Sequence, residues 1–201
     1  MNSWFKTFAV LIFAIIFCKI SYSQERFGIK AGVNFANKNV EGTSFDTKTG
    51  VNAGVMIQFP LGHRFFLHPE LLYSVKGYKI SNKVNLYYIN LPIILGYKIT
   101  SGFSVLIGPE AGYLENANTN PRTNAFNIYN FYRKFDIGID AGAQYSLNKN
   151  FGIDIRYNYG FKDLEEVTIT DPYGNYIDNK IIGANRVIEL TLFYFFNKKK
   201  K

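Results

Sequence analysis

The residues best suited to catalysis in this sequence are two histidines and the polar residues that follow one of them. His63 and His68 are the only histidines, and Glu70 and Ser74 follow His68 at even spacing. Residues two apart in a strand share a face, so His68 and Glu70 should lie close enough to share a hydrogen bond. Ser74 is six residues from His68, about 20 Å in a strand, which is too far for the serine–histidine pair of a lipid-modifying enzyme. We therefore predict no catalysis and interpret His68 as a polar interior residue.

The stretch VTITDPYGNYI, residues 167–177, predicts a hairpin that rises above the rest of the fold, with its turn at Pro172–Gly174. Oxygen atoms of nearby Asp and Asn side chains could bind Ca²⁺, but the chain lacks the twelve-residue calcium-loop pattern. We predict no metal and no cofactor. The four side chains considered are Asp171, Asn175, Asp178 and Asn179.

Residues 1–23 have the pattern of a signal peptide. Lys6 precedes the ten-residue apolar run 8–17, and Ser21 and Ser23 provide the small residues of a cleavage site before Gln24. The run is shorter than the roughly 20 residues of a spanning helix. Phe17 before Cys18 argues against lipidation. We predict one mature domain, 24–201, which has no cysteine and therefore no disulfide or thiol chemistry.

The charge of the chain is concentrated at its C-terminal end. The net charge of +8 falls to +6 when Lys6 and Lys19 are removed, and four of those charges are the tail 198–201. The rest of the domain is near neutral, which argues against a nucleic-acid surface. We expect the tail to be solvated or to contact anionic lipid headgroups on the periplasmic side.

Eight segments alternate apolar and polar residues with a period of two. In FGIDIRYNYGF, residues 151–161, one parity is wholly apolar, and the other holds Asp154, Arg156, Asn158 and two glycines. Such alternation predicts a strand with one apolar and one polar face. The expected strands are 27–35, 51–59, 65–77, 89–99, 103–113, 135–145, 151–161 and 188–196.

The connections between these strands alternate in length. Residues 60–64, 100–102 and 148–150 form tight turns, and 36–50, 114–134 and 162–185 form long polar loops, with 78–88 intermediate. Short turns on one side and long loops on the other are typical of transmembrane β-barrels whose termini are both periplasmic.

Energy decides which face is inside. The apolar parity carries no charge between strand ends, and a basic residue at the lipid midplane would cost roughly 2–4 kcal/mol. We therefore predict an all-β fold: an eight-stranded antiparallel transmembrane up-and-down β-barrel with a filled polar interior. Its predicted interior ion network consists of Lys30, His68, Glu70, Lys76, Lys98, Glu110, Asp136, Asp140, Asp154, Arg156 and Glu189.

Aromatic residues support the membrane interpretation. Phe and Tyr stand at or near strand ends, where aromatic girdles mark the two interfaces. The alternative, a soluble lipocalin-like barrel, would have to fit the whole apolar parity into one small cavity. Pro69, Pro92 and Pro109 fall inside strands, and we expect a bulge or a rim position at each. The predicted girdle residues are Phe27, Phe35, Phe59, Phe103, Tyr113, Phe135, Tyr145, Phe151, Phe161 and Phe196.

Six stretches in order resemble the PorT-type outer-membrane β-barrel family: GIKAGVNF (28–35), HPELLYSVKGY (68–78), YINLPIILGY (88–97), GPEAGY (108–113), FDIGIDAG (135–142) and RYNYGF (156–161). The resemblance implies an eight-stranded barrel inserted by the barrel assembly machinery. Asn90 and Gly96 replace residues that are often acidic and basic in the family, which implies that one interior ion pair is absent. Leu192, Tyr194 and Phe196 resemble the family's terminal insertion signal.

These observations predict an integral outer-membrane protein in a Gram-negative envelope, without catalysis, that acts in structure or in surface interaction through its long loops. The expected partners are outer-membrane lipids, the assembly machinery during insertion, and a protein or surface ligand at the loops. Nucleic acid is excluded. The alternatives left open are a narrow pore, a secretion-accessory barrel and a soluble ligand-binding barrel.

Overall fold

The computed structural model describes residues 25–39, 46–79, 83–119, 132–170 and 176–196. The predicted signal peptide, most of the predicted loop 114–134, the turn at Pro172–Gly174 and the lysine tail lie outside these residues. No helix in the described part of the chain is long and apolar enough to cross a membrane.

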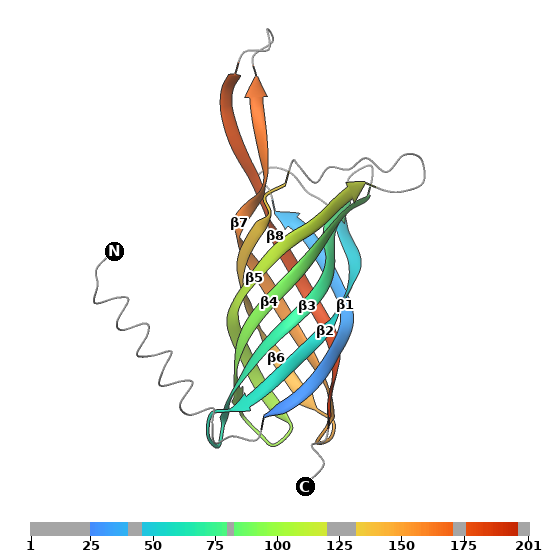
Figure 1. The fold of residues 1–201 in the computed structure, drawn as a ribbon, viewed down its shortest axis with the longest axis vertical. Helices are drawn as coiled ribbons and strands as arrows, with labels where there is room; N and C mark the ends of the chain where they lie inside the picture. The colour runs from blue at the N-terminus through green and yellow to red at the C-terminus, as the bar shows by residue number, and fades with distance from the viewer. Residues whose placement is uncertain (1–24, 40–45, 80–82, 120–131, 171–175, 197–201) are drawn as a thin grey trace, which may run out of the picture.

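The described chain forms one closed antiparallel barrel of eight strands, with β8 paired to β1 (Figure 1). The predicted fold class is confirmed. Both the start of β1 and the end of β8 lie at the end of the barrel that carries the short turns. The strands are β1 (Arg26–Asn39), β2 (Asp46–Pro60), β3 (Phe65–Lys79), β4 (Lys83–Lys98), β5 (Phe103–Thr119), β6 (Phe135–Ser146), β7 (Phe151–Thr170) and β8 (Tyr176–Phe195).

Along the middle of the strands, apolar side chains face outward and the charged side chains face the barrel interior. On β7, Ile155 is 52% exposed on the outside while its neighbour Arg156 is 1% exposed on the inside. Large apolar side chains also cover the outside of the other strands, among them Ile29, Leu71, Ile107 and Leu190. The outer surface is therefore the apolar band that lipid requires, and the charged parity is enclosed.

Aromatic side chains gather in two bands on the outer surface. Near the short turns, Phe65 contacts Tyr97 with ring centroids 4.9 Å apart. Near the long connections, Tyr113 contacts Phe135 at 5.3 Å. The strands continue past this second band, since β5 runs on from Tyr113 to Thr119, about 20 Å along the strand. The sequence pattern missed these extensions and assigned them to loops.

The three in-strand prolines are accommodated without bulges, so that prediction is wrong. Pro69 pairs with Ile93, Pro92 with Glu110 and Pro109 with Ile139, each without a shift in register. Toward its other neighbouring strand, each proline lies at a gap in the series of paired residues. Beside Pro69, for example, the gap lies between Met56↔Glu70 and Phe59↔Leu67, and the register is the same before and after it. Proline removes only one donor, so the ladder opens locally while the register of the strands is preserved.

The longest strands, β7 and β8, form a hairpin that projects beyond the barrel (Figure 1). Pairing of β8 with β1 ends at Asn39↔Ala184, whereas β7 and β8 stay paired up to Thr170↔Tyr176. The projecting part is roughly 27 Å long at the usual rise per residue. The predicted hairpin is thus confirmed as a strand pair.

Both ends of the barrel interior are occupied by apolar side chains. At the end with the short turns, Met56, Phe193 and Phe195 form one cluster, and Phe66, Ile94 and Leu106 form another. Gly96 makes room for Phe66, because a Cβ there would lie 2.1 Å from the Phe66 ring. Here the bulky inward Phe193 and Phe195 of the last strand find their place.

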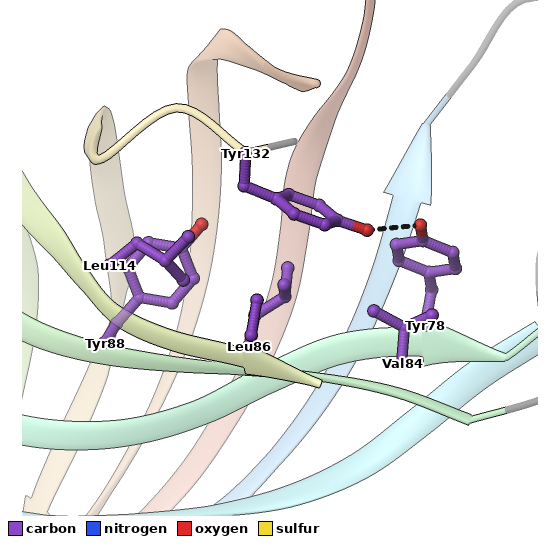
Figure 2. Close-up of a cluster of buried hydrophobic side chains, with 7 residues drawn as sticks. Tyr78, Val84, Leu86, Tyr88, Leu114 and Tyr132 are labelled. Atoms are coloured by element: carbon purple, nitrogen blue, oxygen red, sulfur yellow. Dashed lines mark hydrogen bonds between the residues drawn. The ribbon is translucent and has the colours of Figure 1, made fainter. Parts of the chain in front are cut away.

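At the end with the long connections, seven apolar side chains close the mouth: Tyr78, Val84, Leu86, Tyr88, Leu114, Ala117 and Tyr132 (Figure 2). Tyr132 lies just before β6, and its hydroxyl is 2.7 Å from that of Tyr78 on β3. The interior is therefore filled as predicted, and apolar clusters lie toward both of its ends, with further buried polar side chains such as Gln58, Ser104 and Gln144 near the short turns.

Candidate functional site

The first part of the polar interior is a compact group of paired charges, here called the paired cluster: Lys30, Glu70, Asp154 and Arg156. Strands β1, β3 and β7 supply these side chains, all fully buried. Lys30 Nζ lies 2.6 Å from Asp154 Oδ2 and 3.3 Å from Glu70 Oε2. Arg156 donates from both terminal nitrogens to Glu70, at 3.0 and 2.6 Å.

Every carboxylate oxygen in the paired cluster has a donor. Asp154 Oδ2 accepts from Arg156 at 3.1 Å, and Thr191 donates its hydroxyl to Asp154 Oδ1 at 2.7 Å. Two acids and two bases balance. A two-pronged guanidinium–carboxylate contact in a dry interior is among the stronger charged contacts, so the cluster ties β1, β3, β7 and β8 together.

The second part is a belt of polar side chains, one from each strand, on the side of the paired cluster toward the long connections. We call it the polar ring: Asn34, Asn52, Ser74, Asn90, Glu110, Asp140, Asn158 and Glu189. Register places neighbours opposite each other, as in Asn34↔Glu189, Asn52↔Ser74 and Asp140↔Asn158, or one diagonal step apart. Diagonal neighbours are within reach of side chains of this length.

Amide groups connect much of the ring. Asn52 donates to Asn34 Oδ1 at 2.6 Å, and Asn34 donates to Ser74 Oγ at 2.7 Å. On the acidic side, Asn158 donates to Asp140 Oδ1 at 2.6 Å and to Glu110 Oε1 at 3.2 Å. Sequence reasoning named the three acids but missed the asparagines, whose inward parity was the available signal.

Lys76 is the cation that contacts the polar ring. It lies on β3, and its Nζ is 2.7 Å from Glu110 Oε1. Asn90 donates to that same Glu110 oxygen at 3.1 Å, in the place where the family resemblance implied a missing charge. Asp136 lies beyond the ring toward the mouth and accepts from Asn185 at 2.7 Å. This part of the interior is rich in acid: among the described residues it holds four carboxylates together with Lys76 and Lys48, whose Nζ lies 3.1 Å from the backbone oxygen of Lys76.

His68 is not placed as the sequence suggested. It is fully buried, yet neither ring nitrogen has a hydrogen-bond partner among the described residues, so the expected bond to Glu70 is absent. Its ring lies 4.6 Å from Phe66 and 5.9 Å from Phe195. The inward parity was right, but the residue belongs to the apolar end because Phe66, two residues before it on β3, and Phe195 on β8 surround it with aromatic rings.

Lys98 also lies apart from the network. It is half-buried at the rim near the short turns, with its Nζ 5.9 Å from the centre of the Phe66 ring. Thus the paired cluster unites four of the predicted residues, the polar ring and its neighbours hold five more, and His68 and Lys98 fall outside both.

Comparison with known protein families identifies the family of this chain. A family model described as outer membrane protein beta-barrel domain matches residues 22–166. The chain belongs to this family. Membership of this family implies that the protein is located in the outer membrane, where its apolar outer face contacts lipid.

Solved structures of outer-membrane barrels have the same fold. Neisserial surface protein A is 13% identical with a TM-score of 0.55, over 85% of this chain and 97% of that one. The attachment invasion locus protein Ail of Yersinia pestis is 16% identical with a TM-score of 0.52, over 86% and 99%. A major outer membrane protein from Thermus thermophilus is 13% identical with a TM-score of 0.50, over 86% and 99%. No curated protein matches the sequence.

The geometry of this outer-membrane barrel limits its chemistry. In the paired cluster every carboxylate oxygen has a donor, and among the described residues only Arg156 Nε lacks a partner, so the cluster has the features of a structural element. The polar ring has free oxygen atoms and an excess of acid, which are the features of a site that can hold a cation.

Proposed function

We propose that this outer-membrane barrel is a closed scaffold that presents its projecting hairpin and long connections to a partner outside the cell. The observation that supports it best is a contrast between its ends and its hairpin. Apolar clusters occupy both ends of the interior, whereas β7 and β8 continue as a pair well beyond the barrel. Segments held on a rigid scaffold commonly carry binding specificity.

The proposal assigns no catalysis. His68 is enclosed by aromatic rings, and Ser74 accepts a hydrogen bond from Asn34 inside the polar ring. A nucleophile needs a base within hydrogen-bond reach and an open approach for substrate. Neither condition is supported for these two residues.

Finer assignments are part of the same proposal. We infer that the chain is nearest to the PorT-type barrels it resembles, that the assembly machinery inserts it, and that a signal peptide covering residues 1–23 is removed. The outward positions of Leu192, Tyr194 and Phe196, each at least 42% exposed, support recognition of the last strand during insertion. Sequencing the N-terminus of the mature protein should give Gln24 first; an N-terminus at Met1 would refute cleavage.

The partner is tested with a chain whose projecting hairpin is shortened. Residues 163–183 are replaced by Asn-Gly, which favours a tight two-residue turn. We expect the barrel still to fold, as shown by heat-dependent mobility on mild detergent gels. In cells that express the full-length chain, a photo-crosslinker at Thr170 in the projecting hairpin should yield a discrete crosslinked product with the partner.

The control places the crosslinker at exposed His63 in a short turn, where that product should be absent. A second crosslinker at exposed Glu115, near the end of β5, keeps the comparison possible in the shortened chain. A product at Glu115 that persists unchanged after shortening would show that the hairpin does not bind the partner.

A further inference from the structure

The polar ring contains more hydrogen-bond acceptors than donors. Among the described residues, seven of its buried oxygen atoms have no donor: Asn52 Oδ1, Asn90 Oδ1, Glu110 Oε2, Asp140 Oδ2, Asn158 Oδ1 and both Glu189 carboxylate oxygens. A buried acceptor without a donor is costly, and a buried carboxylate is more so. The paired cluster, which is equally buried, has no carboxylate oxygen without a donor.

These oxygens come from neighbouring strands. Glu110 on β5 faces Gly138, two residues before Asp140 on β6; Asp140 faces Asn158 on β7. Val187, which faces Asn158, is two residues before Glu189 on β8. Side chains at such opposite and diagonal positions reach one another. The acids therefore form one side of the ring.

The amide of Asn158 is held between two of these acids. Its nitrogen donates to Glu110 and to Asp140, so the orientation of the amide is set and its oxygen is the free atom. The residue is 1% exposed. Asn158 Oδ1 and both oxygens of Glu189 on the neighbouring strand are buried acceptors without a donor among the described residues. Amide oxygens and carboxylates together are the ligands that hard cations bind.

We propose that the acidic side of the polar ring, formed by Glu110, Asp140, Asn158 and Glu189, binds one divalent cation. Lys76 pairs with Glu110, and the other two carboxylates, Asp140 and Glu189, add two negative charges, which a doubly charged ion balances better than a singly charged one. Oxygen ligands select hard cations such as Mg²⁺ and Ca²⁺.

The cation keeps part of its water shell. In the described part of the chain, no three carboxylate or histidine side chains converge closely enough to coordinate a metal directly. Mg²⁺ is commonly held by one or two carboxylates while it retains several waters, and those waters donate to the remaining free oxygens. Since apolar side chains close both ends, the ion enters as the barrel forms and exchanges slowly afterwards.

The test measures metal retained by the whole folded chain. Protein is refolded in detergent with Mg²⁺, treated with a chelator, desalted, and analysed by atomic emission. We expect about one Mg²⁺ per folded barrel and none in urea-unfolded protein treated in the same way. Folded protein that holds no more metal than unfolded protein would overturn the proposal without any variant.

Two variants locate the site. Glu189→Gln and Asp140→Asn keep side-chain shape but remove charge, and each should weaken retention about 10–100-fold, as loss of a metal-site partner does. The matched control is Glu115→Gln, the same chemical change at an exposed outward position, which should retain the ion as wild type does. Retention by folded Glu189→Gln and Asp140→Asn equal to wild type, or equal loss in Glu115→Gln, would refute the site.

Discussion

The paired cluster and the polar ring lie side by side in one barrel and treat buried charge in opposite ways. In the paired cluster, two bases meet two acids, and each carboxylate oxygen accepts at least one hydrogen bond. In the polar ring, Lys76 contacts Glu110, while Glu189 has no donor for either oxygen among the described residues. The first group should hold the strands together, and the second should depend on what it binds.

The difference has a physical basis in partner number. Removing one member of a buried, hydrogen-bonded charge pair leaves a desolvated charge alone, which is strongly destabilising. Neutralising a buried charge that has no partner removes a cost instead. Although the two groups are equally buried, mutations in them should therefore change the free energy of unfolding by different amounts.

The largest effect should come from Arg156→Ala. This change strips Glu70 of two hydrogen bonds and Asp154 of one, and we expect a loss of about 3–5 kcal/mol in the free energy of unfolding. This loss is measured by urea unfolding in detergent, with the folded fraction at each urea concentration read from heat-dependent mobility on gels. Arg64→Ala is the control, since exposed Arg64 contacts Tyr97 at 3.0 Å in a short turn. Similar losses in both variants would show that the cluster is not special.

A double-mutant cycle should give the next largest effect. Lys30→Met and Asp154→Asn, made singly and together, report the coupling of a 2.6 Å contact, which we expect to be about 1–3 kcal/mol. The matching cycle with Asp140→Asn and Glu189→Gln in the polar ring, measured in chelator on protein refolded without metal, should show no favourable coupling. A favourable coupling of the same size in the ring would remove the distinction between the two groups.

A smaller effect should follow from Tyr132→Phe at the mouth. The change removes the hydroxyl that contacts Tyr78, and a lost hydrogen bond of this kind costs about 0.5–1.5 kcal/mol. Because the phenyl ring still fills the mouth, we expect Mg²⁺ to remain bound. Tyr132→Ala, by contrast, should release Mg²⁺ to chelator faster, which timed metal analysis would detect; an unchanged release rate would show that this residue does not close the end.

The smallest effect on stability should come from Glu189→Gln in chelator. Protein refolded without metal gains nothing from the charge, so the free energy of unfolding should change by less than about 1 kcal/mol or should rise. With Mg²⁺ present during refolding, wild type should gain stability and the variant should not. A loss in chelator as large as that of Arg156→Ala would mean that Glu189 has a partner of its own.

The membrane-spanning part of the fold could be predicted from the sequence because lipid imposes a strict alternation. Ile153, Ile155 and Tyr157 had to face outward once Asp154 and Arg156 shared the other parity, and the strand number followed from repetition. Beyond the membrane the outer face no longer has to be apolar, so alternation fades, and the extensions of β5, β7 and β8 have the sequence pattern of loops.

The arrangement within the interior was less predictable. Parity shows that Glu70 and Arg156 face inward, but their contact joins β3 to β7 across the barrel, and only the register of several strands brings them together. Tyr132 had no parity to reveal it, since it lies outside the regular alternation. His68 shared the parity of the acids, yet its height in the barrel placed it among Phe66 and Phe195.

The central claim, that this outer-membrane barrel is closed and acts through its surface, is tested most directly by single-channel recording in planar bilayers. Apolar clusters at both ends of a polar interior predict no stable conductance from the folded wild-type chain. Reproducible conductance steps from protein whose folding has been verified by heat-dependent mobility would contradict the account and establish a narrow pore.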